Sequence, residues 1–457
     1  MPWNHAQRPG GPGRLGDWVT GQLGDRLPGG RAAVRPCEDG HAFLAGMTGS
    51  WSMAADRQRH APPSIAFWLV VYVFAVGMLG TTLPTPLYVL YQASWHFSEG
   101  TVTLIYASYA AGVMVSLLFA GRSSDQVGRR PVLWIALALS TASTVVFILA
   151  PGLSFLFVGR VLSGLAAGLI TGTATAALTD LAGPTSGRRA SLASTGANMG
   201  GLGIGPLVAG LFAEYGPNPT VLVFEVYLGL LVVAAVFLLV SPETVEPRSR
   251  LTYRFRGLGI PTQGHGEFLA ASLAGFSAFT LLGLFSSLAP SFLATVLDQD
   301  NRAVAGAVVF FIFAVATVTQ MALSRVASRT VMLAGLWIFL PALALIVAGL
   351  SQASFPLFLV GTGVGGVAVG CLFLGSLATA NRLAPAATRS QVVSTYFLFA
   401  YIGLTIPVIA VGVASQHIGD FRATLICSIV LAALCLCSGL AIMRARVTEP
   451  KTLERPA

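Results

Sequence analysis

The chain has 457 residues, of which 54% are hydrophobic and only 10% are charged. A soluble globular domain carries about 25% charged residues, so this chain has too little polar surface to remain in water. Its mean hydropathy of +0.75 agrees with that conclusion. The composition excludes an ordinary soluble enzyme and indicates an integral membrane protein whose exterior faces lipid.

The net charge of +9 comes from 27 basic and 18 acidic residues, and Lys451 is the single lysine. The arginines form short clusters between long apolar runs, which is typical of loops kept on the cytoplasmic side of a membrane. A nucleic-acid partner is therefore not expected. The five cysteines form no paired framework, and four of them lie in apolar runs, where a thiol packs as a small hydrophobe.

Residues 1–63 differ from the rest of the chain. They are rich in glycine, proline and arginine, and they contain no apolar run long enough for a signal peptide. We expect a disordered cytoplasmic tail. The alternative is that translation starts at Met47 or Met53, in which case the residues before that start are not made.

Twelve apolar segments follow, each long enough for the roughly 20 residues that cross a bilayer as a helix. They cover residues 65–91, 101–121, 131–151, 153–178, 189–213, 219–241, 267–297, 303–324, 330–350, 354–379, 390–415 and 421–443. Because these runs are continuous and do not alternate, a β-barrel is excluded. The sequence predicts an all-α membrane protein with twelve transmembrane helices.

Arginine placement predicts the orientation of these helices. If residues before the first segment are cytoplasmic, the outer loops hold only Arg302 and Arg422. The inner loops then hold thirteen arginines, namely Arg122, Arg129, Arg130, Arg188, Arg189, Arg248, Arg250, Arg254, Arg256, Arg325, Arg329, Arg382 and Arg389. This bias predicts that both termini are cytoplasmic.

The twelve segments divide into two halves. The predicted order is an N-terminal six-helix half over 64–241, a basic cytoplasmic loop over 242–266, a C-terminal six-helix half over 267–443 and a cytoplasmic tail over 444–457. A shift of 202 positions places three glycines of the fourth segment on three of the tenth, namely Gly159, Gly164 and Gly168 on Gly361, Gly366 and Gly370. This repeat predicts two pseudo-symmetric halves with substrate between them, which is a transporter architecture.

The loop after the second segment reads GRSSDQVGRRPVL, over residues 121–133. Its pattern of Gly-x3-Asp-x2-Gly-Arg-Arg resembles motif A of the major facilitator superfamily, and it lies in the expected cytoplasmic loop. The resemblance implies the major facilitator fold and a rocker-switch mechanism, and the twelve-helix layout is similar to the drug/proton antiporter branch. The matched residues are Gly121, Asp125, Gly128, Arg129 and Arg130.

We expect motif A to act as a gating latch. Gly121 and Gly128 would allow tight turns, and Asp125 would meet the positive end of a helix or an arginine of the other half. Arg129 and Arg130 would bind lipid phosphates or acidic side chains. The alternative is a cytoplasmic anchor that is basic whatever the fold.

The fourth segment contains FLFVGRVLSGLAAG, over 155–168, which is similar to motif B of the same family. Its Arg160 lies within the membrane, where a charged side chain costs about 2.5–3.5 kcal/mol and therefore predicts a function. The resemblance implies proton coupling with a nearby carboxylate, and Glu225 is the only carboxylate clearly inside an apolar run. The alternatives are an arginine that binds backbone carbonyls and a Glu225 that lies near the outer interface.

The fifth segment contains GANMGGLGIGPLVAG, over 196–210, which resembles motif C, the antiporter signature of the family. Gly201, Gly205, Pro206 and Gly210 match, and Ala209 departs from the pattern. The glycines would let helices approach closely and the proline would kink the helix. The alternative is glycine packing with no bearing on the direction of transport.

The substrate cavity is predicted with less detail. The first segment carries Pro84 and Pro86, and the seventh carries Pro290 near the equivalent place, which points to a binding or gating region. The second half has no acid within its apolar runs, which favours neutral, amphipathic or anionic substrates over cationic drugs. Five polar or aromatic residues are candidates for the cavity, although each could simply pack, namely Tyr72, Asn198, Gln320, Tyr396 and Tyr401.

Neither a phosphate-binding GxxxxGK[ST] loop nor a set of three metal ligands is visible in the sequence. We therefore expect no enzyme activity, no cofactor and no metal. The predicted function is proton-coupled efflux of a small drug-like or metabolite substrate across the plasma membrane by alternating access, by a protein that works as a monomer. The alternative is a proton symporter or facilitator that imports a sugar, an organic acid or an amino acid.

Overall fold

The computed structural model describes residues 61–120, 123–183, 186–245, 258–385 and 388–444. In this part of the chain every regular element is helical, and twelve spans are long and apolar enough to cross a membrane. The expectations for the N-terminal tail before residue 61, its alternative start sites, Gly121, the middle of the 242–266 loop and the tail after residue 444 lie outside the described residues.

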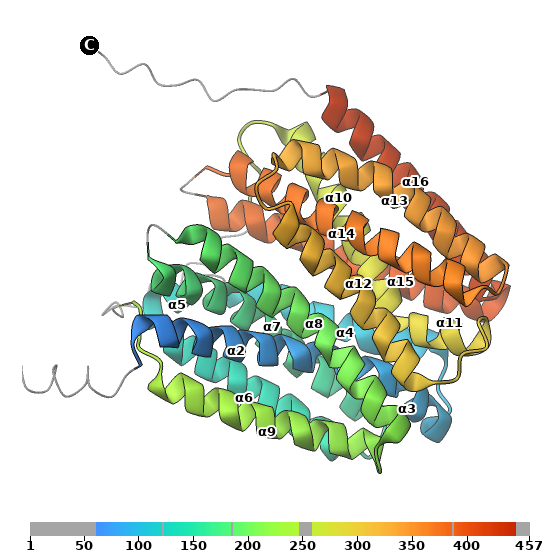
Figure 1. Cartoon of the computed structure of the whole chain (residues 1–457), viewed down its shortest axis with the longest axis horizontal. Coiled ribbons are helices and arrows are strands. Elements are labelled where there is room, and N and C mark those ends of the chain that lie inside the picture. The colour runs from blue at the N-terminus through green and yellow to red at the C-terminus, as the bar shows by residue number, and fades with distance from the viewer. Residues whose placement is uncertain (1–60, 121–122, 184–185, 246–257, 386–387, 445–457) are drawn as a thin grey trace, which may run out of the picture. The chain divides into compact units, whose positions relative to one another are not determined.

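The described residues of the first half form eight α-helices and one short 3-10 helix. These are α2 (Pro63–Thr82), η1 (Thr85–Leu87), α3 (Tyr88–Trp95), α4 (Glu99–Ala120), α5 (Ser123–Val127), α6 (Arg129–Ile148), α7 (Leu153–Ala182), α8 (Gly187–Tyr215) and α9 (Pro219–Val240). Figure 1 draws them in blue to yellow-green, and they lie beside one another as one group.

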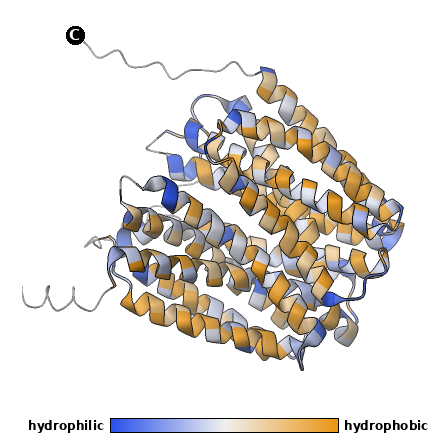
Figure 2. Cartoon of the chain, viewed as in Figure 1, coloured by the Kyte–Doolittle hydropathy of each residue, from blue (hydrophilic) through white to orange (hydrophobic). Residues whose placement is uncertain are grey.

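The second half forms seven α-helices, drawn in yellow to red in Figure 1. These are α10 (His265–Ser287), α11 (Ala289–Thr295), α12 (Arg302–Ala322), α13 (Ser328–Ser351), α14 (Phe355–Leu383), α15 (Arg389–Ile418) and α16 (Asp420–Arg444). Apolar residues run along the lengths of the helices, and hydrophilic ones gather at their ends (Figure 2). This is the distribution expected when the hydrocarbon core of a bilayer surrounds the middle of each helix.

The first and seventh spans are interrupted at their prolines. Helix α2 ends at Thr82, and the chain passes through η1, which contains Pro86, before α3 begins. Helix α10 ends at Ser287, and Pro290 lies in the first turn of α11. Proline lacks a backbone N–H and cannot continue the hydrogen-bond pattern of a helix. The interruptions therefore occupy the same place in each half.

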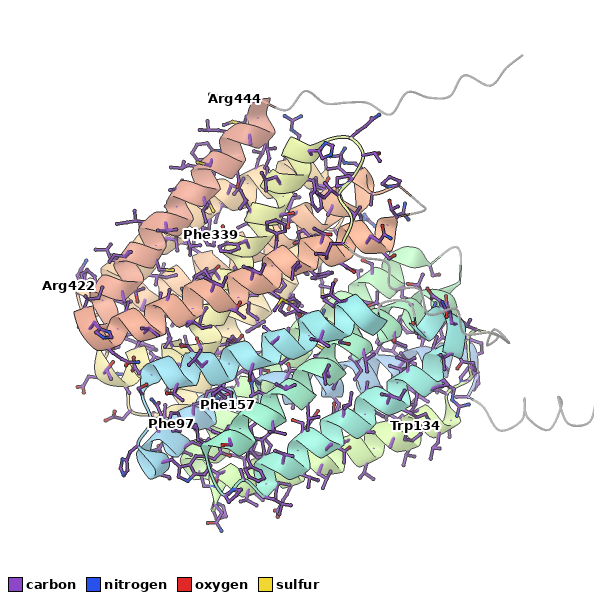
Figure 3. All side chains as sticks on the ribbon, turned by 180° about the vertical axis from the view of Figure 1, so that it is seen from behind. Phe97, Trp134, Phe157, Phe339, Arg422 and Arg444 are labelled. Carbon is purple, nitrogen blue, oxygen red and sulfur yellow. The ribbon has the colours of Figure 1, made fainter. Side chains whose placement is uncertain are left out.

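The two ends of the bundle can be told apart by charge. The end at which α2 begins and α9 ends is called here the basic end, and a hydrogen bond from the Ala61 N–H to the Val240 carbonyl joins the two chain segments there. The opposite end, at which α7 begins, is called the far end. Figure 3 shows Arg444 and Arg422 at the two ends of α16, at the basic end and the far end respectively.

The repeated glycines hold equivalent helix pairs together in the two halves. A Cβ atom on Gly164 of α7 would overlap the carbonyl oxygen of Tyr109 in α4. A Cβ atom on Gly366 of α14 would lie 2.9 Å from the carbonyl oxygen of Ile312 in α12. Small residues let helix backbones approach closely where lipid supplies no hydrophobic force between helices. The repeat thus preserves the same close helix contact in both halves.

Two helix pairs join the halves to each other. Helix α8 packs along α12, and α4 packs along α15. Two glycines face each other in the first pair, since a Cβ atom on Gly210 would lie 3.0 Å from the Cα atom of Gly306. In the second pair, a Cβ atom on Gly412 would overlap the side chain of Thr103. Small residues therefore make a close helix contact in both pairs.

The close contact between α7 and α4 gives a prediction for stability. Gly164→Ala forces a methyl group into the Tyr109 carbonyl, and overpacking of this kind costs about 1–3 kcal/mol. Gly172 lies on the same helix with nothing within 4 Å of an added Cβ atom, so Gly172→Ala should be neutral or stabilising by about 1 kcal/mol. The midpoint of thermal unfolding in detergent measures both changes, and equal midpoints for the two variants would contradict this packing.

Candidate functional site

A cavity lies between the two halves of the chain and takes its walls from both. Together with the solvent that it opens to, it comprises about 610 Å³ of space that protein atoms do not fill. Helices α2, α4, α7 and α8 supply the wall from the first half, and α10, α12, α14 and α15 supply the wall from the second half. None of the described residues that line this cavity is acidic.

Arg160 is the single charged side chain among the described residues of the cavity wall. It is fully buried, with 0% of its surface exposed. It lies seven positions after Leu153, the first residue of α7, which places it about 10 Å from the far end at 1.5 Å per residue. The close contact of α7 with α4 brings its guanidinium group against two rings of α4, 5.3 Å from the centre of Tyr106 and 4.8 Å from the centre of Tyr109.

The guanidinium group of Arg160 is only partly satisfied by the protein. Its Nη1 donates a hydrogen bond to the carbonyl oxygen of Thr81 in α2. Its Nε and Nη2 atoms are buried and have no hydrogen-bond partner among the described residues. The two tyrosine faces add cation–π attraction, but they do not replace the missing acceptors. An arginine in a membrane interior usually pairs with an acid or with carbonyls, whereas two of the three guanidinium nitrogens of Arg160 lack such a partner among the described residues.

The opposite wall of the cavity is aromatic. Tyr401 stacks edge to face on Phe279, with ring centres 5.4 Å apart, and Phe373 lies 5.5 Å from Phe279. Phe397 adjoins both Phe373 and Tyr401. A hydrogen bond between the side chains of Tyr109 and Tyr401 crosses from the first half to the second. The cavity therefore has a cationic wall and an aromatic wall.

Two of the five residues predicted for the cavity line it, Asn198 and Tyr401. The other three do not. Tyr72 donates a hydrogen bond of 3.4 Å to the Leu230 carbonyl in α9. Tyr396 is fully buried and its hydroxyl lies 2.7 Å from that of Ser376. Gln320 is buried in α12, and its Nε2 atom has no partner among the described residues.

Glu225 does not meet Arg160. It is exposed on the surface of α9, whereas Arg160 is enclosed between α2, α4 and α7. No ion pair among the described residues joins the two side chains. The expected pairing is therefore absent, because α9 turns the glutamate face of its helix away from the cavity.

The far end of the interface is closed by polar contacts between the halves. The carboxylate of Glu214, at the end of α8, accepts a hydrogen bond of 3.0 Å from the backbone N–H of Arg302, the first residue of α12. The side chain of Glu99, at the start of α4, is hydrogen bonded to that of Asp420, at the start of α16. Within the second half, Thr295 of α11 also donates a hydrogen bond of 3.2 Å to Asp420.

At the basic end a groove adjoins the interface. Together with the solvent that it opens to, it comprises about 1020 Å³ of unfilled space, and it is lined by α2, α8 and Met321 of α12. Arg189 lies in this groove with its guanidinium carbon 4.5 Å from the centre of the Phe67 ring. Direct polar contacts between the halves thus lie at the far end, and the groove at the basic end is lined mainly by the first half.

The glycines of the motif C segment face two different helices. Cβ atoms on Gly201 and Gly205 would meet the carbonyl oxygens of Ala75 and Leu79 in α2. Gly210 faces Gly306 of α12 instead, and Pro206 lies inside α8 without ending it. The segment thus packs α8 against its own half and against the other half.

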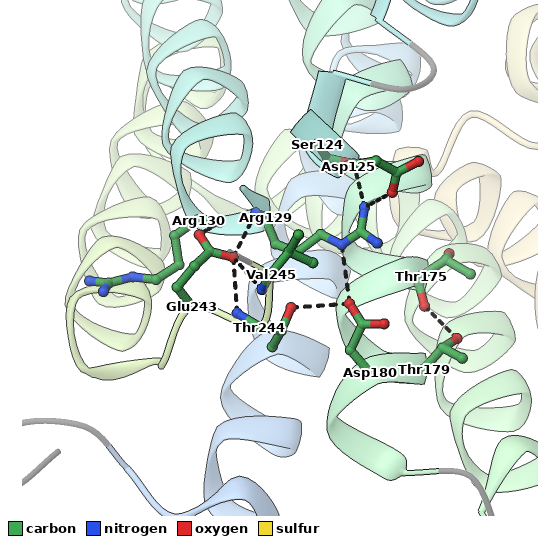
Figure 4. A network of polar contacts seen from close by, with 10 residues as sticks. All are labelled: Ser124, Asp125, Arg129, Arg130, Thr175, Thr179, Asp180, Glu243, Thr244 and Val245. Atoms are coloured by element: carbon green, nitrogen blue, oxygen red, sulfur yellow. Dashed lines mark hydrogen bonds and ion pairs between the residues drawn. The ribbon is translucent and has the colours of Figure 1, made fainter. Parts of the chain in front are cut away.

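The motif A residues form a polar network at the basic end (Figure 4). The Arg129 guanidinium group bonds to Asp125 at 2.5 Å, to Ser124 at 2.8 Å and to Asp180 of α7 at 3.2 Å. Arg129 was expected to bind lipid phosphates or acidic side chains, and the two acids that it contacts lie in the first half, on α5 and α7. Gly128 has φ of +108°, a conformation that favours glycine.

A carboxylate beyond the motif completes this network. Glu243, which follows α9, accepts hydrogen bonds from the backbone N–H groups of Arg129 at 2.8 Å and Arg130 at 2.9 Å. It also accepts them from its own neighbours, Thr244 and Val245. This carboxylate satisfies free N–H groups at the start of α6. Sequence reasoning missed Asp180 and Glu243, although both are acids beside arginine clusters.

Comparisons with known proteins agree on one family. Residues 66–330, more than half of the chain, match the model of the Major Facilitator Superfamily. Multidrug resistance protein 2 of Bacillus subtilis is 26% identical over 177 residues, which cover 39% of this chain and 44% of that protein. Multidrug resistance protein D of Escherichia coli is 30% identical over 101 residues, or 22% and 26%. The matched stretch spans less than half of either relative.

Solved structures show the same fold. A bacterial homologue of the human lysosomal transporter Spinster, in an inward-facing and unoccupied conformation, gives a TM-score of 0.68 at 15% identity over 84% of this chain and 97% of that one. A human organic anion transporter gives 0.60 at 18% identity over 84% and 100%. The predicted fold class of twelve helices in two six-helix halves is confirmed.

The Glu243 contact gives a second prediction for stability. Glu243→Gln keeps the shape of the side chain but removes the negative charge at the start of α6, which should cost about 1–2 kcal/mol. The midpoint of thermal unfolding should fall. Glu225→Gln is the matched control, because this exposed side chain makes the same chemical change without such contacts. An equal fall of the midpoint in Glu225→Gln would show that Glu243 does not stabilise the protein by capping α6.

Proposed function

The chain belongs to the Major Facilitator Superfamily, and from this premise we propose that it exports a small drug-like or metabolite substrate across the plasma membrane in exchange for protons. As a multi-pass membrane transporter of this family, it acts on a small molecule and sits in a lipid bilayer. The observation that carries the proposal is the cavity between the halves, because both halves supply its walls. Alternate opening at the two ends would expose one binding site to each side in turn.

The orientation is part of the proposal. The basic end carries the arginine-rich loops, and such loops remain in the cytoplasm, so both termini would lie there. The contacts at the far end would then seal the cavity from the outside, while the groove at the basic end adjoins the cytoplasmic side. A single chain holds both halves and the whole cavity between them, which supports a working monomer.

Two observations support export over import. The relatives from Bacillus subtilis and Escherichia coli are both called multidrug resistance proteins. In addition, the segment similar to motif C packs α8 closely on α12, at the interface that must open and close. Glycine contacts of this kind limit leakage because no side-chain gaps remain between the helices.

The carboxyl pair at the far end supports coupling to protons. Two carboxyl groups hydrogen bond directly only when they share a proton, since two carboxylates in contact repel each other. Glu99 belongs to the first half and Asp420 to the second, so proton binding would favour closure at this end. The other charged or titratable side chains that flank the pair along the chain, His96, His417 and Arg422, are exposed. Glu225 is exposed on α9 outside the cavity, so this proposal gives it no part in coupling.

Proton coupling sets the gradient that the transporter could sustain. The membrane potential contributes about 2.3 kcal/mol per charge for each 100 mV. One proton that enters with each exported neutral molecule would therefore support a concentration ratio of roughly fiftyfold, since 1.4 kcal/mol corresponds to a factor of ten.

The direction of transport can be measured in everted membrane vesicles that contain the full chain. With an acidic interior imposed, fluorescent amphipathic substrates should accumulate inside, and an uncoupler should stop the accumulation. Vesicles without the protein are the control. Uptake of sugars, organic acids or amino acids into right-side-out vesicles, with no accumulation in everted ones, would support an importer instead.

The carboxyl pair can be tested separately from transport itself. In Asp420→Asn an amide can hydrogen bond to the Glu99 carboxylate without a proton, so closure should lose its dependence on pH. Accumulation driven by a proton gradient should fall to the level seen without one. Exchange of labelled for unlabelled substrate should continue, which shows that the variant is folded. Glu225→Gln is the control and should keep both activities. Retained gradient-driven accumulation in Asp420→Asn would remove the pair from coupling.

A further inference from the structure

The cavity combines one unsatisfied cation with an aromatic wall, and this combination indicates a class of substrate. Arg160 is fully buried on the side of the first half. Phe279, Phe373 and Phe397 lie on the side of the second half. Neither wall holds an acid among the described residues. The charge of Arg160 is therefore not neutralised by the protein around the cavity.

The free donors of Arg160 form a pair suited to one kind of acceptor. With Nη1 bonded to Thr81, the buried atoms without a partner are Nε and Nη2. These two N–H groups lie on the same edge of the guanidinium plane and donate in parallel, which matches the two oxygens of a carboxylate or a phosphate. The rings of Tyr106 and Tyr109 and the bond to Thr81 restrict this plane. The acceptor would thus meet donors that are already oriented.

We propose that the cavity binds an amphipathic organic anion, with its anionic group on the Nε and Nη2 edge of Arg160 and its apolar body against the aromatic wall. This inference rests on the proposed transport function and names the substrate class for it. It also assigns Arg160 to the substrate, whereas the family resemblance implies a part in proton coupling. An anion supplies both missing acceptors and neutralises the buried charge.

The other classes of substrate fit less well. A cation would enter a site whose only charge has the same sign, with no acid to offset it. A neutral apolar molecule would fill the aromatic side but would leave both donors buried and unpaired, which is unfavourable. A small inorganic anion would satisfy Arg160 but would leave the aromatic wall without contact. Only a molecule with both parts uses both walls.

Three isosteric probes test the charge requirement on the wild-type protein, so that no variant has to fold. They are pyrene-1-butyrate, its uncharged amide and the corresponding primary amine, and their affinities can be measured by the thermal shift of the purified full chain in detergent. A bidentate, charge-assisted pair should make the acid bind about ten- to hundredfold more tightly than the amide. The amine should bind more weakly than either. Inorganic phosphate should not compete with the acid at equal concentration.

Variants then locate the contact. Arg160→Gln should reduce the affinity for the acid to that for the amide, while the affinity for the amide stays unchanged and shows that the cavity is intact. Arg160→Lys keeps the charge but loses the parallel donors, and should give an intermediate value. Arg325→Gln, which removes an exposed arginine outside the cavity, is the matched control and should bind like the wild type.

The results separate this inference from the transport proposal, because binding in detergent needs no gradient. Equal affinity for acid and amide, preference for the amine, or no binding of the acid would each overturn the anion assignment. Efflux driven by protons would still stand in that case. Conversely, tight binding of the acid through Arg160 without proton-driven transport would support the substrate class and overturn proton-coupled export.

Discussion

Helices in lipid gain no hydrophobic driving force from association, because hydrocarbon chains are as apolar as the side chains that face them. Association then depends on close packing of backbones, and in this chain glycine makes that packing possible. Gly164 brings α7 against α4, and Gly366 brings α14 against α12 in the other half. The position of Arg160 follows from the first of these contacts, since it places the guanidinium group on the rings of α4. The cavity and its charge therefore depend on a glycine contact one turn away.

The fold could be predicted from the sequence because each transmembrane helix is indicated by features of its own segment. Apolar length marks a transmembrane helix, arginine clusters mark its ends, and prolines mark the interruptions of the first and seventh spans. The structure confirms twelve spans in two halves. The glycine repeat between the fourth and tenth segments also has a direct structural meaning, because Gly159 faces Phe147 of α6 and Gly361 faces Ile346 of α13.

The site could be predicted only in part, because the residues that line the cavity are decided by which face of each helix turns inward. Asn198 and Tyr401 line the cavity, but Tyr72 and Tyr396, chosen on the same grounds, pack elsewhere. Residue type cannot separate these cases. The same holds for Glu225, since an acid within an apolar run can face either neighbouring helices or the exterior, and Glu225 is exposed. The aromatic wall had no signal in the sequence, because phenylalanine is common in every membrane span.

The contact between Gly210 and Gly306 has a consequence for motion. Helices that pack through large side chains interlock, ridge into groove, and must separate before one can turn against the other. At this point α8 and α12 touch through backbone atoms alone. At Gly210 and Gly306 no side chain has to leave a groove when one helix turns on the other, whereas at Gly203 α8 packs on the side chains of Phe310 and Phe313. The glycine crossing can therefore act as a fulcrum. The free energy needed to change conformation would then go mainly into breaking the polar contacts at the far end, which lie within reach of solvent.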